Sequence, residues 1–344
     1  MNSARAASGR RSPRATDASE IEGLAEAVLA GDRRALARAI TLVESTRADH
    51  RARAESLLGR LMPASGRSIR LGVSGAPGVG KSTFIEAFGL HLIEQGRRVA
   101  VLAVDPSSKR AGGSILGDKT RMERLANAPT AFIRPSPAGS TLGGVASRTR
   151  EAMLVAEAAG FDAIIVETVG VGQSETAVAD MVDMFMLLLL PGGGDELQAM
   201  KRGIIELADL LVVTKADGEL AAAAGRAVAD YRHAAQLMRP RSSNWRPPVL
   251  QCSALTGSGI AEVWRTVERY HATLSASGEL AGRRAEQARA WLASELSAGL
   301  LAALQSDPRV DAMLRPIEAD VTAGRLSPAA AARKLLAVFR GEKE

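Results

Sequence analysis

The chain has 344 residues, which is enough for one α/β domain of ordinary size with helical additions. Hydrophobic residues make up 46% of the sequence, which excludes global disorder, and the low aromatic content of 3% means that the core must consist of Leu, Val, Ile and Ala. The single cysteine, Cys252, excludes an intramolecular disulfide and a zinc site made of several cysteines.

The net charge of +6 raises the hypothesis of a nucleic-acid partner. Much of the excess lies in one tail, because the first sixteen residues carry four arginines and no acid, and basic and aromatic residues are not interleaved elsewhere. The central apolar run Met184–Leu190 is far shorter than the roughly 18 residues of a membrane span. No apolar signal-peptide core follows the N-terminus. We therefore expect no nucleic-acid or membrane partner and a cytoplasmic location.

Helical patterns precede the central part of the chain. Residues 1–19 are predicted to form a disordered basic tail. Between Glu20 and about Leu61 apolar residues recur at spacings of three and four, which predicts a helical extension over residues 20–67. Gly31 separates its first two helices, and Asp32 is positioned to cap the second.

From residue 68 to about 270, short β-rich runs alternate with helical stretches. Most of the runs are continuously apolar, as expected for strands that are covered on both faces, so a mostly parallel sheet within an α/β domain follows. The predicted strands are Ile69–Ser74, Val99–Asp105, Ala131–Ile133, Ala163–Glu167, Met184–Leu190, Leu210–Thr214 and Val249–Cys252.

Residues 271–344 show no strand pattern and are predicted to form a C-terminal helical arm. The arm carries an apolar stripe with a spacing of four residues, and prolines separate further helices. Such a stripe can face its own domain or a second copy of the chain. The stripe consists of Leu292, Leu296, Leu300 and Leu304, and the prolines are Pro308, Pro316 and Pro328.

A phosphate-binding motif follows the first predicted strand and precedes a helix. This setting is the one that G-x-x-x-x-G-K-[ST] requires, because its glycines let backbone N–H groups point at phosphate oxygens at a helix N-terminus. We expect Lys81 to reach the β- and γ-phosphates and Ser82 to ligate Mg²⁺. The motif consists of Gly75, Ala76, Pro77, Gly78, Val79, Gly80, Lys81, Ser82 and Thr83.

Three acids are candidates for the magnesium and catalytic groups that such a site needs. Asp105 ends the second predicted strand, Asp118 lies in a Gly-Asp-Lys-Thr segment, and Glu167 ends the fourth strand. Gly170 completes an E-x-x-G sequence and could donate its N–H group to the γ-phosphate. Helix capping or a surface turn is the alternative for each acid, most clearly for Asp118.

A guanine-reading sequence follows the sixth predicted strand. The carboxylate of Asp217 can accept hydrogen bonds from N1–H and the 2-amino group of guanine, which adenine does not offer in that arrangement. Lys215 would lie over the ring. Thr214 stands where Asn is usual, so the amide that ties the base loop to the phosphate loop is lost, at a cost of about 1 kcal/mol. The backbone of Ser253, Ala254 and Leu255 would offer N–H groups to the guanine O6.

These residues resemble those of the MeaB/ArgK-type GTPases that are associated with methylmalonyl-CoA mutase. The resemblance covers most of residues 69–255, and the block 114–122 is very specific. The matching stretches are 75–83, 105–108, 112–122, 166–175, 191–198 and 201–203.

The resemblance implies a P-loop NTPase fold of the SIMIBI class and a homodimer held by C-terminal helices. It also implies a chaperone that uses Mg²⁺ and GTP/GDP, gates cofactor loading of an adenosylcobalamin-dependent acyl-CoA mutase, and protects or reactivates the mutase. Asp105, Asp118 and Glu167 carry over as magnesium and water-positioning residues. A third switch over residues 191–203 carries over with its candidate contacts Asp195, Gln198 and Lys201.

The residue that activates the water is not evident, since no Gln follows Gly170 directly and no arginine finger can be named. We therefore expect slow intrinsic hydrolysis that a partner stimulates. A metal-inserting GTPase, a P-loop small-molecule kinase and a regulatory switch without a mutase remain as alternatives. The first would need clustered soft ligands, whereas Cys252 is alone and the four histidines are dispersed.

Overall fold

The computed structural model describes residues 13–104, 122–135, 142–168, 174–192, 202–236 and 240–342. The chain divides into two compact units, residues 1–284 and residues 285–344. The first unit holds the whole sheet, and the second holds the end of α13 together with α14 and α15.

Seven strands form one parallel sheet in the order β3-β2-β4-β1-β5-β6-β7. The predicted mostly parallel α/β sheet is thereby confirmed, and every strand starts at the residue where the apolar runs place it. The carboxyl ends differ by one residue each, because loops begin there. The strands are β1 Ile69–Gly75, β2 Val99–Val104, β3 Ala131–Arg134, β4 Ala163–Thr168, β5 Met184–Leu189, β6 Leu210–Val213 and β7 Val249–Gln251.

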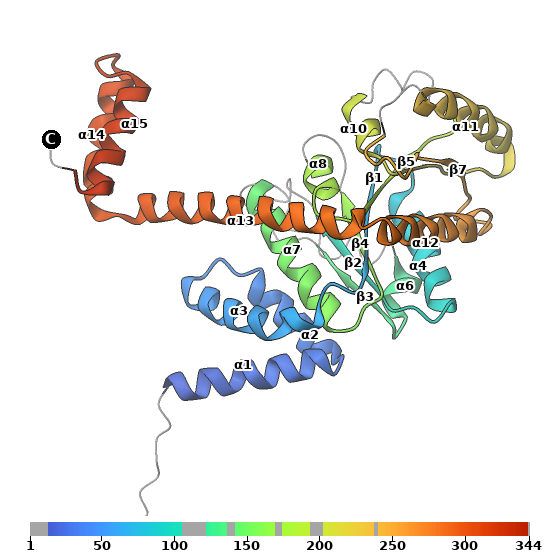
Figure 1. The fold of residues 1–344 in the computed structure, drawn as a ribbon, viewed down its shortest axis with the longest axis horizontal. Helices are drawn as coiled ribbons and strands as arrows, with labels where there is room; N and C mark the ends of the chain where they lie inside the picture. Colours follow the sequence, from blue (N-terminus) through green and yellow to red (C-terminus); the bar gives the residue numbers. More distant parts are fainter. Residues whose placement is uncertain are drawn as a thin grey trace, which may run out of the picture. The chain divides into compact units, whose positions relative to one another are not determined.

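Helices cover both faces of the sheet in the first unit (Figure 1). On one face, α4 contacts β1 and β2 and packs against α12, while α7 and α8 contact the central strands from the other face. Strands that are covered on both faces need apolar side chains throughout, and all residues of β2, β4 and β5 are buried. The helices of this unit are α1 Pro13–Leu29, α2 Arg33–Val43, α3 Ala48–Leu61, α4 Lys81–Glu94, α6 Glu123–Asn127, α7 Leu142–Ala158, α8 Ser174–Ala179, α10 Arg202–Leu207, α11 Ala221–Gln236 and α12 Ile260–Ala276, with short 3-10 turns at Met62–Ala64 and Gly218–Leu220.

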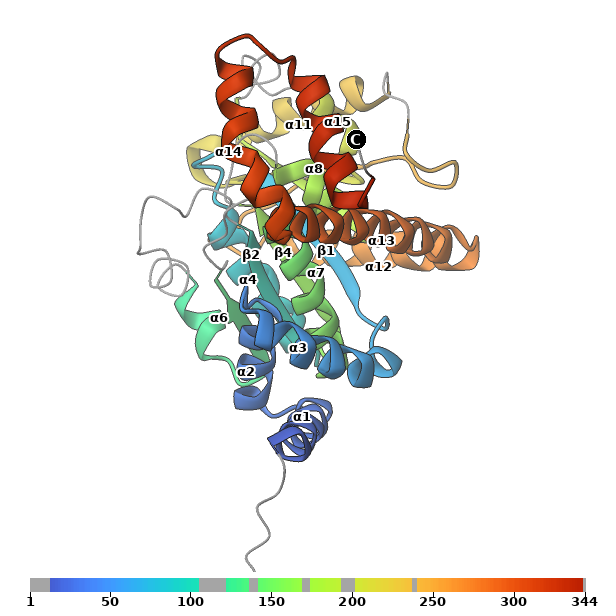
Figure 2. The ribbon, with the colours of Figure 1, turned by 90° about the vertical axis from the view of Figure 1, so that its left-hand side faces the viewer.

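The three N-terminal helices pack against one another, and α2 and α3 lie on α7 (Figure 2). The predicted cap is confirmed, because the Asp32 side chain accepts the Ala35 N–H at 2.6 Å at the start of α2. The helix α1 begins at Pro13, earlier than the Glu20 start that periodicity indicates. Proline suits the first helical position, since the N–H group that it lacks would have no partner in the helix.

Aspartates cap the amino edge of the sheet in a repeated way. Three of them directly precede a strand, and each accepts a backbone N–H group at or just before the start of the neighbouring strand. Such bonds satisfy donors that a parallel ladder leaves unpaired at its edge. The pairs are Asp162 with Arg98 at 2.7 Å, Asp183 with Arg70 at 2.9 Å and Asp209 with Phe185 at 2.9 Å.

Two consecutive arginines at the start of α13 (Glu279–Ser306) neutralise two of these aspartates. Arg284 donates to both carboxylate oxygens of Asp183, and Arg283 donates to the carboxylate of Asp209 at 3.2 Å. The side chains of Asp183 and Asp209 are 0% and 3% exposed, so each charge needs a partner. The first turns of α13 are therefore part of the unit that contains the sheet.

In the second unit, α14 (Pro308–Thr322) packs against α15 (Pro328–Arg340). Pro308 and Pro328 begin helices as predicted. Pro316 differs from the prediction, because it lies inside α14 rather than between two helices. Its ring removes one hydrogen bond of the helix, and the flanking turns continue on either side of it.

Candidate functional site

The predicted phosphate loop joins β1 to α4. Gly78 and Gly80 have φ values of 83° and 92°, in the left-handed region that glycine adopts without strain, and Gly80 directly precedes α4. The chain therefore turns so that the first N–H groups of α4, which have no partner within the helix, lie at the loop. This arrangement is able to bind an anion through backbone N–H groups.

Gly75 is required by close packing at the end of β1. A Cβ atom at this position would lie 2.6 Å from the backbone oxygen of Leu188 and 3.0 Å from a methyl group of Val79. Leu188 lies on the neighbouring strand β5 and pairs with Gly75 in the sheet register. A side chain at residue 75 would thus push the loop off the central strands.

Lys81 stands at the first position of α4, and its ammonium donates to the carbonyl oxygens of Gly75 at 2.7 Å and Ala76 at 3.3 Å. Burial lowers the pKa of Lys81 below the ordinary lysine value, whereas the carboxylates of Glu167 and Glu175 act in the opposite direction. The two buried acids therefore partly offset the effect of burial on the pKa of this lysine.

Glu175 ends the matching stretch 166–175 but was not among the predicted site residues. It lies in the first turn of α8 and is 3% exposed. Its burial, which the sequence does not show, is what marks this residue, because acids are rarely buried without an electrostatic reason.

The Ser82 hydroxyl donates to Glu167 at 3.3 Å, and the Thr168 hydroxyl donates to Ser74 at 2.9 Å. These bonds join the loop and β1 to the end of β4. A hydroxyl and a carboxylate are hard oxygen donors of the kind that Mg²⁺ prefers, so Ser82 and Glu167 fit this ion. Among the described residues, no group of three or more His, Cys, Asp or Glu side chains forms a metal cluster.

The base loop contacts the phosphate loop directly. The Thr214 hydroxyl donates to the Val79 carbonyl at 2.7 Å, and the Lys215 ammonium donates to the Gly78 carbonyl at 2.8 Å. The expectation that Thr214 gives up the tie between the two loops is wrong, because its hydroxyl is close enough to replace an amide donor. Lys215 has a φ of 55°, the one positive value of a non-glycine residue in the described part of the chain.

Asp217 is oriented by a neighbouring strand end. The Ser253 hydroxyl, just after β7, donates to the Asp217 carboxylate and accepts the Thr256 N–H at 3.1 Å. The backbone N–H of Ser253 donates to Ser258 at 2.9 Å, so it is not available to a base. Of the three predicted backbone donors, this arrangement leaves those of Ala254 and Leu255.

The structure thus brings part of the predicted site together at the carboxyl ends of β1, β4, β6 and β7. Residues 75–83, Glu167, residues 214–217 and Ser253 are joined to one another by the hydrogen bonds above. Ala254 and Leu255 follow Ser253 directly and are described as well, whereas the remaining candidates lie outside the described residues. They are Asp105, Asp118, Gly170, Asp195, Gln198 and Lys201.

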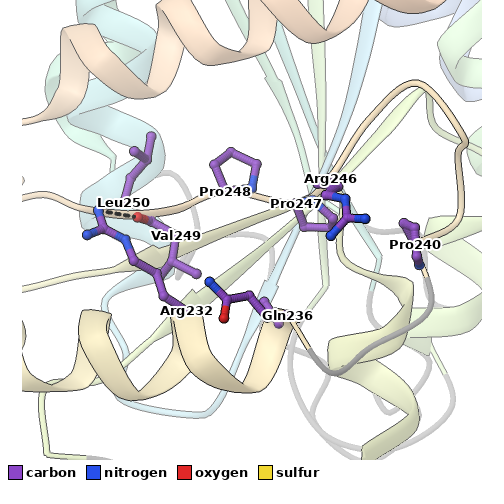
Figure 3. Close-up of a pocket in the computed structure, with 9 residues that line it drawn as sticks. Arg232, Gln236, Pro240, Arg246, Pro247, Pro248, Val249 and Leu250 are labelled. Atoms are coloured by element: carbon purple, nitrogen blue, oxygen red, sulfur yellow. Dashed lines mark hydrogen bonds between the residues drawn. The ribbon is translucent and has the colours of Figure 1, made fainter.

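A surface cavity of about 250 Å³ lies between α11 and the chain that leads into β7 (Figure 3). Its lining includes Arg232, Gln236, Arg246 and three prolines, and Arg232 donates to the Val249 carbonyl at 3.2 Å. None of the lining residues belongs to the predicted nucleotide set. In the part of the chain that the structure describes, no helix is long and apolar enough to span a membrane.

Comparison with known proteins extends over most of the chain. A family model described as methylmalonyl Co-A mutase-associated GTPase MeaB matches residues 36–309. A Caulobacter vibrioides protein described as a putative GTPase is 56% identical over 320 residues, which cover 93% of this chain and 98% of that protein. The GTPase ArgK of Escherichia coli is 48% identical over 305 residues, with coverage of 89% and 92%. A crystal structure described as a LAO/AO transport system kinase matches with a TM-score of 0.73 and 40% identity, covering 94% of this chain and 98% of that chain.

Proposed function

Because the chain belongs to the MeaB family of methylmalonyl-CoA mutase-associated GTPases, we propose that its GTPase activity serves an adenosylcobalamin-dependent acyl-CoA mutase. In this role the protein gates cofactor loading and protects or reactivates the mutase. The family description supports the link to methylmalonyl-CoA mutase. The related isobutyryl-, ethylmalonyl- and hydroxyisobutyryl-CoA enzymes are further candidate clients.

The hydrogen bond between Ser253 and Asp217 is the observation that best supports a preference for GTP over ATP. The Ser253 hydroxyl fixes the orientation of the carboxylate, whose two oxygens are acceptors for N1–H and the 2-amino group of guanine. Lys215, two residues before Asp217, is held against the phosphate loop by its bond to Gly78. An acceptor that finds no matching donor on adenine disfavours ATP.

Among the described residues, Ser82 and Glu167 are the proposed ligands of Mg²⁺, either directly or through water. Asp105 and Asp118 remain predicted ligands of the same ion. The bound ion would neutralise charge on the β- and γ-phosphates. Lys81, whose ammonium lies at the loop, is the proposed cation for the same oxygens. Glu167 is also the proposed group that positions the attacking water, together with the N–H of Gly170.

Hydrolysis is proposed to be slow in the isolated protein and faster when the mutase orders the third switch, with Asp195, Gln198 and Lys201 as contacts. A homodimer through the C-terminal helices is part of the same proposal. Three leucines of the predicted stripe on α13 support it, because more than half of each residue is exposed. They are Leu292 at 62%, Leu296 at 58% and Leu300 at 64%. A cytoplasmic location stays a prediction.

A small-molecule kinase is the second candidate, since one similar crystal structure is described as a transport system kinase. A metal-inserting GTPase is less favoured, because Cys252 is buried and the described residues hold no cluster of metal ligands.

The test is steady-state hydrolysis of GTP and ATP with Mg²⁺, with and without candidate adenosylcobalamin mutases. We expect slow GTP turnover that one mutase increases, with little ATP turnover. Asp217→Asn should remove the preference for GTP and spare the fold, because the two side chains have the same shape. Turnover of ATP that equals that of GTP, unchanged by every mutase, would contradict the proposal and favour the kinase.

A further inference from the structure

Two consecutive residues of the base loop hold two consecutive carbonyl groups of the phosphate loop. Thr214 donates to Val79, and Lys215 donates to Gly78. The bonds join residues that are 135 and 137 positions apart in the sequence. Both side chains bind carbonyl oxygens of the phosphate loop. The N–H groups of the loop, which would bind a phosphate, are not used by these bonds.

The Thr214 hydroxyl has one proton and two carbonyl oxygens within reach. Val79 lies at 2.7 Å and Leu189 at 3.2 Å, so the shorter bond takes the proton. The Leu189 carbonyl already accepts the backbone N–H of Thr214 at 2.9 Å. Thr214 and Val79 are both buried, at 4% and 0% exposure, so water does not readily replace the bond.

The carbonyl groups matter because the peptide units on each side of Val79 can turn over. Gly78 and Gly80 flank this residue with positive φ values, and glycine rotates with little steric resistance. An anion-binding loop needs its N–H groups facing the ligand, and a rotated peptide would present a negative carbonyl there instead. A donor on the Val79 carbonyl opposes that rotation.

We propose that Thr214 is a positioning residue for the phosphates rather than for the base, and that it acts by holding the Val79–Gly80 peptide in its anion-binding orientation. The proposal rests on the nucleotide site proposed above. Lys215 supports the adjacent peptide in the same way, although it also borders the base position. Asp217, three residues after Thr214, is then the residue of this loop that reads guanine.

The experiment compares ligands with and without a base. Binding of GDP and of inorganic pyrophosphate, each with Mg²⁺, is measured by calorimetry for the wild type, Thr214→Val, Thr214→Ser and Asp217→Asn. Valine keeps the shape of threonine without the donor, and serine keeps the donor. We expect Thr214→Val to weaken both ligands by the same factor, roughly 5- to 20-fold, as for a lost buried hydrogen bond. Thr214→Ser should remain within about twofold of the wild type because its hydroxyl restores that bond. Asp217→Asn should weaken GDP alone.

Loss of GDP affinity in Thr214→Val with unchanged pyrophosphate affinity would overturn the proposal, because the residue would then act through the base. Unchanged affinity for both ligands would overturn it as well. Melting of the nucleotide-free variants shows whether a loss reflects unfolding.

A double-mutant cycle on GDP alone decides the case if pyrophosphate binds too weakly to titrate. Additive losses from Thr214→Val and Asp217→Asn support separate roles, whereas a Thr214→Val loss that disappears in the Asp217→Asn background contradicts them. Failure of the wild type to bind GDP would instead refute the nucleotide site itself.

Discussion

Arg284 binds Asp183 through two parallel hydrogen bonds, 2.8 Å from Nε to Oδ1 and 2.6 Å from Nη2 to Oδ2. The same guanidinium donates to the backbone oxygens of Gly66 at 2.5 Å and Ser68 at 2.7 Å. One side chain of α13 therefore closes the amino edge of the sheet beside β1 and β5. The carboxylate that it neutralises also holds the backbone of Arg70.

Arg284→Ala is expected to lower the free energy of unfolding by roughly 3–5 kcal/mol, because it leaves the Asp183 charge buried without its partner. Urea unfolding followed by circular dichroism measures the change. Arg265→Ala is the matched control, since Arg265 pairs with Glu262 at the surface and such a pair contributes about 1 kcal/mol or less. Equal losses in the two variants would contradict the role given to Arg284.

Gly75→Ala is expected to abolish GDP binding, because the added Cβ would lie 2.6 Å from the Leu188 oxygen and the buried β5 strand cannot retreat. Gly96→Ala is the control. Gly96 also needs a positive φ, at 77°, but a Cβ there has no neighbour within 4 Å. It should lower stability by about 1 kcal/mol and leave binding intact. Calorimetric titration with GDP compares the two variants. Normal GDP binding by Gly75→Ala would show that the contact with Leu188 does not restrict residue 75.

Ionisation of the Cys252 thiol is expected to lower the free energy of unfolding as the pH rises in the alkaline range. Burial raises its pKa to about 12 in the folded protein, compared with 9.0 for an unperturbed thiol. The unfolded chain therefore loses this proton first, so the contribution is complete below pH 9 and declines as the pH rises toward 12. The decline amounts to at most about 1.4 kcal/mol per pH unit.

Comparison with Cys252→Ala isolates this contribution from other titrating groups. The difference in unfolding free energy between wild type and variant should shift against the wild type from pH 8 to pH 10. A difference that stays constant over this range would show that the thiol is not buried as described.

The exposed leucines of α13 give a test of the proposed homodimer. Leu292→Glu with Leu296→Glu should convert a dimer to a monomer, because charges at a buried apolar contact lose their hydration. Ser294→Glu with Ala298→Glu adds the same charge on another side of α13 and should leave the dimer intact. Light scattering after size-exclusion chromatography reads the mass. A monomeric wild type, or dimers in both double variants, would argue against this surface.

The sequence predicts the parts of this molecule that depend on local patterns. Continuous apolar runs located the start of each strand, because strands that are covered on both faces leave no room for alternation. The phosphate loop was predicted equally well, since its glycines and Lys81 all lie within the nine residues 75–83. The predicted carboxyl end of each strand differed from the observed end by one residue, because the residues found there occur both at strand ends and in loops.

Contacts between distant residues could not be read in this way. The bond from Thr214 to Val79 spans 135 positions, and the pair of Arg284 with Asp183 spans 101. A substitution of Asn by Thr therefore looked like a loss, although the fold places the hydroxyl against the loop. Glu175 was missed for the same reason, because its role comes from its electrostatic interaction with Lys81, which is far away in the sequence.

The strand order has a consequence for how the protein is made. The central strand β1 pairs only with β4 and β5, so its last residue, Gly75, finds its partner Leu188 after 113 further residues have been added. At 5–20 residues per second, a ribosome needs roughly 6–23 s for that stretch. During this interval the apolar strand and its glycine-rich loop emerge without the neighbours that will cover them. The nascent chain is thus most exposed to misassociation before β5 leaves the ribosome.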